Sequence, residues 1–190
     1  MKSPITGIAI LCLIAISFSN CTNQERIKRI ARIDSLENII TATSEIFDSI
    51  DWEIIENQSI ITRENIDYIH RYYTDTMSKE EAEILTNYYN ANKGYAKLMA
   101  LKIQNAEEIK YSKEQLENLK TDVNNGLIDI KKYRKYINTE SKAVNQLNIT
   151  IRNIEKVHSK IDPLFDSSSS TVNLLVSKLR QEQIEQQKEE

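Results

Sequence analysis

The feature that most constrains this fold is an apolar stripe, in alternating steps of three and four, that continues over residues 116–161. This spacing places side chains on one face of an α-helix. The stripe passes through Gly126 without losing phase, so it predicts a single helix over 113–162 that ends at Pro163. Its members are Leu116, Leu119, Val123, Gly126, Ile130, Tyr133, Ile137, Glu140, Val144, Leu147, Ile151, Ile154, His158 and Ile161.

Similar stripes predict further helices on both sides of the longest one. A first helix is expected over 24–57, a second over 60–73, a third over 79–109 and a last one from Val172. Capping boxes mark two of the expected helix starts, because in each box two side chains satisfy each other's unpaired backbone N–H groups. These pairs are Ser78 with Glu81 and Ser112 with Gln115.

Scarce helix breakers support an all-α fold. Only 3 Gly and 2 Pro occur in 190 residues, which leaves little material for the tight turns of a β-rich chain. Each stripe must be buried by another, and short connections near residues 58, 76, 111 and 165 favour antiparallel neighbours. We therefore predict an elongated antiparallel helical bundle with coiled-coil-like helices. A parallel coiled-coil homodimer is the alternative solution, and Gly94 leaves a bend in the third helix open.

The N-terminus has the pattern of a secretory signal. Lys2 precedes an apolar run over 5–18, and polar residues follow at once. A run of this length is typical of a signal peptide, whereas a membrane-spanning helix needs about 20 apolar residues. The sequence contains 2 Cys, and Cys12 would be removed with the signal. Cys21 would then be alone, so no intramolecular disulfide is expected.

The residues before this cysteine resemble a lipobox. "FSNC" at 18–21 is similar to the site where bacterial lipoprotein signals are cut before a cysteine that is acylated, for example with palmitate. The resemblance implies a signal peptide over 1–20 and a lipid on Cys21. Thr22 and the lack of an acidic run after it resemble outer-membrane sorting to the periplasmic face. The alternative is an ordinary secreted protein with one leftover thiol.

The remaining chain is then divided into a helical bundle over 21–165 and a C-terminal amphipathic helix with a polar tail over 166–190. Two histidines raise a metal hypothesis, because each follows a carboxylate by three residues. The pairs are Asp67 with His70 and Glu155 with His158. Carboxylate-x-x-His from two helices is half of a bundle-core site for iron, manganese or zinc. Acidic residues are so frequent here that two boundary histidines with ordinary helix-surface partners are the favoured interpretation.

Tyrosines gather around the expected connection at 74–78. The group comprises Tyr68, Tyr72, Tyr73, Tyr88 and Tyr89. Such rings either pack in a core with a wet hydroxyl or form a partner surface. Within the connection, Thr76 in "DTM" resembles an acceptor for O-glycosylation in Gram-negative envelopes. Further on, "KKYRKY" at 131–136 favours a solvated helix face, with lipid headgroups or an acidic partner as the alternative.

The net charge and the absence of catalytic motifs argue against nucleic-acid binding and against enzymatic activity. The net charge of -3 provides no strong attraction for nucleic acid, and no Gly-rich phosphate loop, nucleophile elbow or H-E-x-x-H motif occurs. We expect no enzyme and no cofactor beyond the lipid. The expected function is that of a lipid-anchored envelope scaffold, spacer or protein-binding module, with another envelope protein or a second copy as partner. The alternatives are a bundle-core metal protein and a chaperone-like adaptor that grips clients with its tyrosines.

Overall fold

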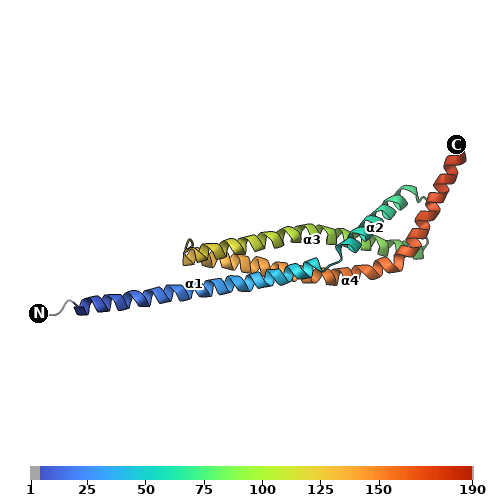
Figure 1. The fold of residues 1–190 in the computed structure, drawn as a ribbon. Helices are drawn as coiled ribbons and strands as arrows, with labels where there is room; N and C mark the ends of the chain where they lie inside the picture. Colours follow the sequence, from blue (N-terminus) through green and yellow to red (C-terminus); the bar gives the residue numbers. More distant parts are fainter. Residues whose placement is uncertain (1–4, 190) are drawn as a thin grey trace. The chain divides into compact units, whose positions relative to one another are not determined.

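The protein is all-helical over the part of the chain that its structure describes. The structure is a computed structural model that describes the backbone of residues 5–189 and the side chains of residues 23–154 and 156–188. It contains α1 (Ile5–Asp48), α2 (Trp52–Tyr72), α3 (Lys79–Asn124) and α4 (Ile130–Glu189), with no strand in that range (Figure 1). The all-α prediction is confirmed. The side chains of the expected signal peptide and of Cys21 lie outside the described residues.

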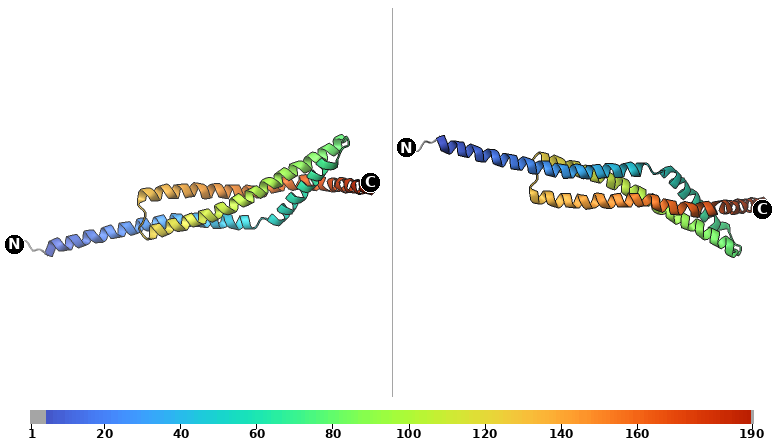
Figure 2. Two further views of the ribbon diagram at one scale, coloured as in Figure 1. Left: turned by 90° about the horizontal axis from the view of Figure 1, so that it is seen from above. Right: turned by 90° about the horizontal axis from the view of Figure 1, so that it is seen from below.

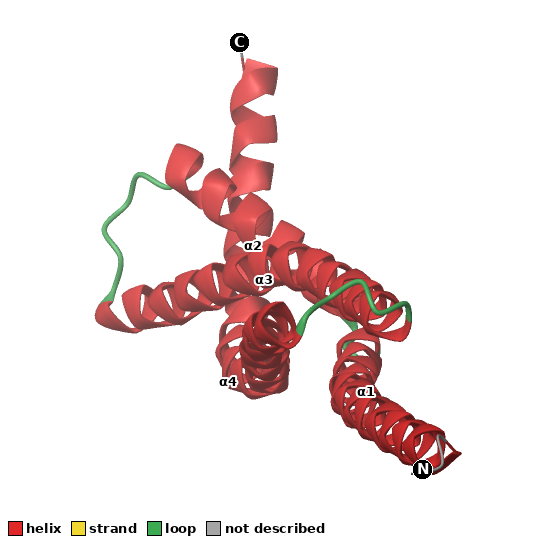
Figure 3. Ribbon diagram, turned by 90° about the vertical axis from the view of Figure 1, so that its left-hand side faces the viewer, coloured by secondary structure: helices red, strands yellow, loops and turns green. Residues whose placement is uncertain are grey.

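The chain divides into two compact units. Unit 1 comprises residues 1–44 and 108–148, and unit 2 comprises residues 45–107 and 149–190. Helices α3 and α4 each contribute one part to each unit, and the residue-number colours of Figure 2 let the reader locate these parts. The connections between helices are green in Figure 3.

In unit 1, α3 runs antiparallel to α1, and α4 runs parallel to α1. Lys113 of α3 donates to Ser44 of α1, and Lys120 of α3 donates to Glu37 of α1. A later residue of α3 thus meets an earlier residue of α1, so the two helices are antiparallel. The Tyr133 hydroxyl donates to the Arg29 carbonyl at 3.1 Å. Farther along both helices, the Asn148 side-chain amide donates to the Thr43 hydroxyl at 2.6 Å, so α1 and α4 advance together.

The core of unit 1 is built mainly from the aliphatic side chains of the predicted stripes. Its buried members include Ile33, Leu36, Ile40, Leu116, Leu119, Val123, Ile137, Val144 and Leu147. Burial of such side chains contributes roughly 1.5–3 kcal/mol each. Glu140 is also buried, at 9% exposure, and burial raises the pKa of its carboxyl. The stripe thus predicts this core, including its one buried carboxylate among the described residues.

In unit 2, α3 is antiparallel to both α2 and α4. The Asn65 amide of α2 donates to the Tyr88 hydroxyl of α3 at 2.9 Å, and Thr62 donates to Asn92 one turn farther along α3 at 3.1 Å. The Tyr95 hydroxyl of α3 donates to Asp162 of α4 at 3.2 Å. One core cluster contains Ile66, Ile69, Tyr88, Val172, Val176 and Leu179. Residues 166–189 therefore continue α4, which packs in this unit as far as Leu179.

The prediction of a first helix ending at residue 57 is wrong. α1 ends at Asp48, and Asp51 caps the start of α2 by accepting from the Ile54 N–H at 3.1 Å. The Trp52 indole N–H bonds back to the Phe47 carbonyl at 3.0 Å, which fixes the turn. This interruption shifts the apolar phase by one residue. Ile55 is therefore buried in place of Ile54, which is 48% exposed.

The predicted helix over 113–162 is also wrong. α3 continues through the buried Ser112 to Asn124, so the Ser112–Gln115 capping box and the connection near 111 do not form. The break lies at Gly126, whose φ of 67° is the left-handed conformation that glycine adopts most easily. The spacing continues across this break because Val123 before the turn and Tyr133 after it are buried in the same core, although Ile130 is 38% exposed and Ile128 is buried in its place. Periodicity alone does not register the turn.

Pro163 does not end the last helix as predicted. α4 continues to Glu189 with Pro163 inside it, and α4 bends within unit 2 where its colour changes from orange to red (Figure 1). A proline is the usual cause of such a bend. The Ser167 and Ser168 hydroxyls bond to the Leu164 carbonyl, so the serine run, expected to be a cap or hinge, satisfies its polar groups within the helix.

The structure also tests the predicted capping box at the start of α3 and the bend that the sequence left open at Gly94. The Ser78–Glu81 capping box is confirmed: the Ser78 N–H donates to the Glu81 carboxylate at 2.8 Å, and the Glu81 N–H donates to the Ser78 hydroxyl at 3.2 Å. At Gly94 the helix is continuous. A Cβ atom there would lie 2.5 Å from the Ile161 Cδ1 atom, so this glycine allows close approach between α3 and α4 in unit 2.

Candidate functional sites

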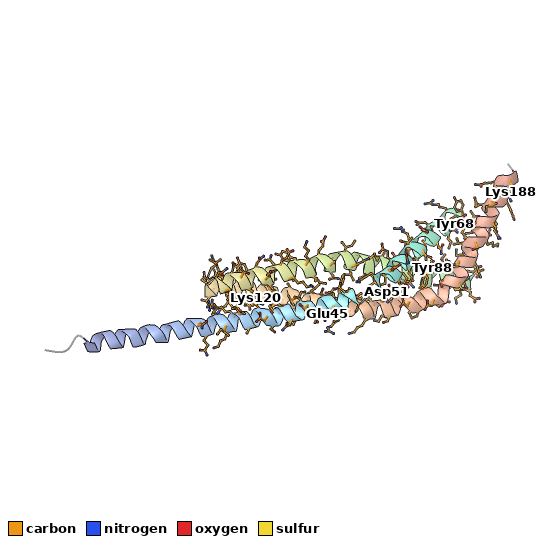
Figure 4. All side chains as sticks on the ribbon, in the orientation of Figure 1. Glu45, Asp51, Tyr68, Tyr88, Lys120 and Lys188 are labelled. Atoms are coloured by element: carbon orange, nitrogen blue, oxygen red, sulfur yellow. The ribbon has the colours of Figure 1, made fainter. Side chains whose placement is uncertain are left out.

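The five tyrosines of the proposed partner surface all lie in unit 2, but they do not share one role. Tyr88, labelled in Figure 4, is fully buried, and its hydroxyl accepts a hydrogen bond from Asn65. Tyr73 is half-buried, whereas Tyr72 and Tyr89 are 37% and 40% exposed. The half-buried Tyr68 ring lies 4.6 Å from the Tyr72 ring. One tyrosine therefore belongs to the core, and four border the surface.

Cations cover two of these surface rings. The Arg180 guanidinium lies 5.2 Å from the centre of the Tyr68 ring, and the Lys93 ammonium lies 4.5 Å from that of Tyr89. Each contact is worth roughly 0.5–1 kcal/mol at exposed sites. Each contact therefore modestly favours the observed orientation of its ring.

An open groove of about 300 Å³ lies beside the exposed Tyr89 in unit 2. It is lined by Ile66, Ile69, His70, Met77, Ala82, Leu85, Thr86 and Tyr89. Apolar side chains with a few polar groups are the usual lining of a recognition site. Sequence reasoning indicated the tyrosines but missed Met77 and Leu85 as groove residues. The signal available was the capping box, since Met77 and Ala82 occupy the positions of its hydrophobic staple.

The structure places the candidate metal ligands as follows. Asp67 and His70 are exposed on α2, His158 is half-buried on α4, and the side chain of Glu155 is not described. His70 faces the groove, while His158 pairs with Asp162. Among the side chains that the structure describes, no three His, Cys, Asp or Glu residues come together as a metal-binding group.

His158 belongs instead to a polar cluster between α3 and α4. Its Nε2 atom lies 3.1 Å from Asp162 Oδ1, which also accepts from the Tyr95 hydroxyl. The His158 contact does not meet hydrogen-bond geometry, and it is an ion pair only when the imidazole is protonated. Burial and the neighbouring Asp162 raise the pKa of Tyr95, so its hydroxyl remains a donor. This cluster joins the two helices.

Thr76 lies exposed in the connection between α2 and α3. The connection spans residues 73–78. An exposed, non-helical hydroxyl is accessible to a modifying enzyme, so the placement is compatible with the predicted O-glycosylation.

Unit 1 contains a polar groove of about 520 Å³ between α1 and α3. The Lys120 ammonium on this surface lies 2.7 Å from the Asp34 carboxylate and 2.6 Å from that of Glu37 (Figure 4). These two carboxylates raise the pKa of Lys120. The charge of Lys120 is thus compensated by Asp34 and Glu37.

Comparison with protein-family models, curated proteins and solved structures finds no match to this chain. Its function must therefore be argued from its own residues. Within the residues that the structure describes, no helix is both long enough and apolar enough to cross a membrane.

Proposed function

We propose that this chain is a bacterial envelope lipoprotein, acylated on Cys21, that acts as a non-enzymatic helical spacer carrying a protein-binding module. The observation that carries the proposal is the continuity of α1, which runs from Ile5 to Asp48 without a break. Cys21 therefore lies on the same helix that enters the core of unit 1 at Ile33. Removal of residues 1–20 would leave a mature helix that starts at the lipid.

A helical tether differs physically from a flexible one. The twelve residues from Cys21 to Ile33 correspond to about 18 Å of helix at 1.5 Å per residue. A flexible linker would let the attached unit sample many positions, whereas a helix restricts its distance from the lipid. This restriction is what a spacer or scaffold requires.

The groove in unit 2 supports the binding-module part of the proposal. Its apolar lining and the exposed Tyr89 at its edge suit an apolar side chain of another envelope protein. The same groove favours the chaperone-like adaptor as the second candidate function. The two differ in their partners, because a scaffold binds one defined protein and an adaptor binds many clients.

The anchor is tested by changing Cys21 to Ser in the native host. We expect the variant to leave the membrane fraction, because acyl chains contribute about 0.8 kcal/mol per buried CH₂ group to membrane binding. Cys12→Ser is the matched control and is expected to remain in the membrane pellet. Equal membrane partitioning of Cys21→Ser and the unchanged protein would contradict the anchor.

The binding module is tested by photo-crosslinking in cells. A crosslinking amino acid replaces Tyr89 at the groove, and the matched control replaces Tyr111, which is 56% exposed in unit 1. A scaffold predicts one dominant product from position 89 that is absent from position 111. Many products from position 89 would favour the adaptor, and identical products from both positions would refute the groove as the binding site.

A further inference from the structure

The turn between α3 and α4 leaves a leucine exposed at one end of unit 1. The Leu127 N–H bonds to the Asp122 carbonyl at 2.9 Å, and the Gly126 N–H bonds to the Val123 carbonyl at 3.3 Å. These two bonds form a Schellman motif, in which the residue after the glycine commonly packs against the residue four positions before the glycine. Here these two residues are Leu127 and Asp122. Asp122 offers no apolar partner, and Leu127 is 73% exposed.

Two more apolar side chains are exposed at the same end of unit 1. Ile27 is 58% exposed on α1, and Ile130 is 38% exposed at the start of α4. We call these two residues and Leu127 the apolar tip. Single exposed apolar residues are common on proteins, but a group of them at one end of a unit favours an interaction surface.

The helix register places this tip near the proposed lipid. α1 and α4 are parallel in unit 1, and Tyr133 is level with Arg29 through their hydrogen bond. Three residues earlier on each helix, Ile130 is level with Arg26. Arg26 lies five residues after Cys21, which is about 8 Å along a helix. The tip therefore lies at the end of unit 1 from which the lipid would extend.

Exposed cations lie on α1 and α4 beside the apolar tip. We call this group the basic collar, and it comprises Arg26, Lys28, Arg32, Lys131, Lys132, Arg134 and Lys135. Residues 23–32 carry four cations and one carboxylate, and the level-matched residues 122–135 carry four cations and two carboxylates. Their combined net charge is about plus five, whereas the whole chain carries -3. Positive charge is thus concentrated at one end of unit 1.

We infer that the apolar tip and basic collar form a second membrane contact, with the collar on acidic phospholipid headgroups and Leu127 inserted among them. The inference rests on the proposed function, because the lipid on Cys21 would bring the tip to the membrane. Exposed cations beside exposed apolar side chains match the chemistry of a lipid interface, which presents phosphates above acyl chains. An acidic protein or nucleic acid would explain the collar but not the exposed leucine. The contact would seat one end of unit 1 on the membrane surface.

The test uses vesicle co-sedimentation of the full chain with Cys21→Ser, so that acylation does not contribute. Vesicles contain phosphatidylcholine alone or with phosphatidylglycerol. Lys131→Glu/Lys132→Glu is compared with Lys110→Glu/Lys142→Glu, which makes the same charge change at exposed positions farther along unit 1. Glutamates in the first turn of α4 suit the helix dipole, so folding is expected to persist, as circular dichroism would check.

We expect the collar variant to lose at least about thirty-fold in partitioning onto acidic vesicles, because each lost lysine contributes about five-fold and the introduced glutamates add repulsion. The control variant should lose much less, and added salt should reduce the difference between them. The apolar residues 5–18 are present in every variant and cancel in the comparison. Leu127→Ser should weaken binding several-fold, whereas Tyr111→Ser should not.

Equal partitioning of collar and control variants would overturn the inference. It would also be overturned if the collar bound a soluble polyanion such as heparin but showed no preference for acidic vesicles, since the partner would then be a soluble acidic macromolecule. Neither result depends on acylation. Release of Cys21→Ser from cell membranes could still support the anchor when the collar inference fails, and the reverse also holds.

Discussion

The helices within unit 1 pack in a different way from the helices within unit 2. Unit 1 has a mostly aliphatic core with one buried tyrosine, Tyr133, bonded across helices to the Arg29 carbonyl, and its ion pairs lie at the edges, as with Lys120 on Asp34 and Glu37. Unit 2 buries aromatic rings whose hydroxyls bond across helices, as with Tyr88 on Asn65 and Tyr95 on Asp162. Aliphatic stripes specify that helices pack, whereas buried hydrogen bonds specify which positions must face each other. Unit 1 therefore suits a spacer, and unit 2 suits a defined recognition surface.

The largest expected effect comes from removing a buried ring of unit 2. Tyr88→Ala should cost about 3–5 kcal/mol of unfolding free energy, because it leaves a cavity and removes the hydroxyl bonded to Asn65. Tyr89→Ala, at the exposed neighbouring position, should cost about 1 kcal/mol or less. Urea denaturation of both variants measures the difference. Similar losses in the two variants would contradict the assignment of Tyr88 to the core.

Gly94 in α3 of unit 2 and Gly126 in the turn of unit 1 are required for different reasons. Gly94 leaves space for a neighbouring side chain, whereas Gly126 adopts a left-handed backbone conformation. Gly94→Ala should cost about 1–3 kcal/mol through overlap with Ile161, and this cost should vanish in an Ile161→Ala background. Gly126→Ala should cost about 1–2 kcal/mol through its positive φ alone. Nothing lies within 4 Å of a Cβ atom at residue 126, so trimming neighbours should not rescue it. Additive losses for Gly94→Ala and Ile161→Ala would disprove the close approach.

Glu140 is the exception within the aliphatic core of unit 1. Glu140→Leu should stabilise the protein by about 1–3 kcal/mol at neutral pH, because it removes a buried polar group. Burial raises the pKa of Glu140, so its destabilising effect is present above the folded pKa and is lost as pH falls below the ordinary value of 4.5. The advantage of Leu should therefore shrink on acidification. Glu114→Leu, at an exposed position of α3, is the control, and a pH-independent gain at 140 would contradict the account.

The smallest expected effect concerns the surface ion pairs of unit 1. Lys120→Met should lower the melting temperature by less than about 2 °C, since such pairs contribute little and are screened by salt. The difference from the unchanged protein should disappear in high salt. A large loss that persists in high salt would mean that these pairs, rather than the aliphatic stripe, hold unit 1 together.

The sequence predicts the helical class and much of the aliphatic core, but it misplaces the helix ends. Apolar spacing reports which face is buried, and this is why Ile33, Leu36 and Ile40 are correctly placed. It does not report backbone conformation. The left-handed turn at Gly126 therefore escapes it. The continuation of α4 through Pro163 depends on tertiary packing of the residues beyond it, which local propensity does not contain.

For the candidate sites, too, the sequence predicts some features and misses others. Local motifs are reliable where their contacts are local, as with Ser78 and Glu81. Long-range sites are not, because Met77 and Leu85 join Ile66 and Tyr89 in one groove only after α2 and α3 pack. Likewise, the sequence places Leu127 inside the predicted helix over 113–162, and only the turn at Gly126 and the register of α1 and α4 bring it near the basic residues that follow Cys21.

The central claim is a helical spacer joined to a membrane through Cys21, and intact-mass analysis of protein extracted from the native membrane tests it most directly. The account predicts a chain that lacks residues 1–20 and begins at Cys21, with the mass of attached acyl chains on that residue. Fragmentation of the N-terminal peptide should place the added mass on the cysteine. A chain that retains residues 1–20, or a mature chain with an unmodified Cys21 thiol, would contradict the claim.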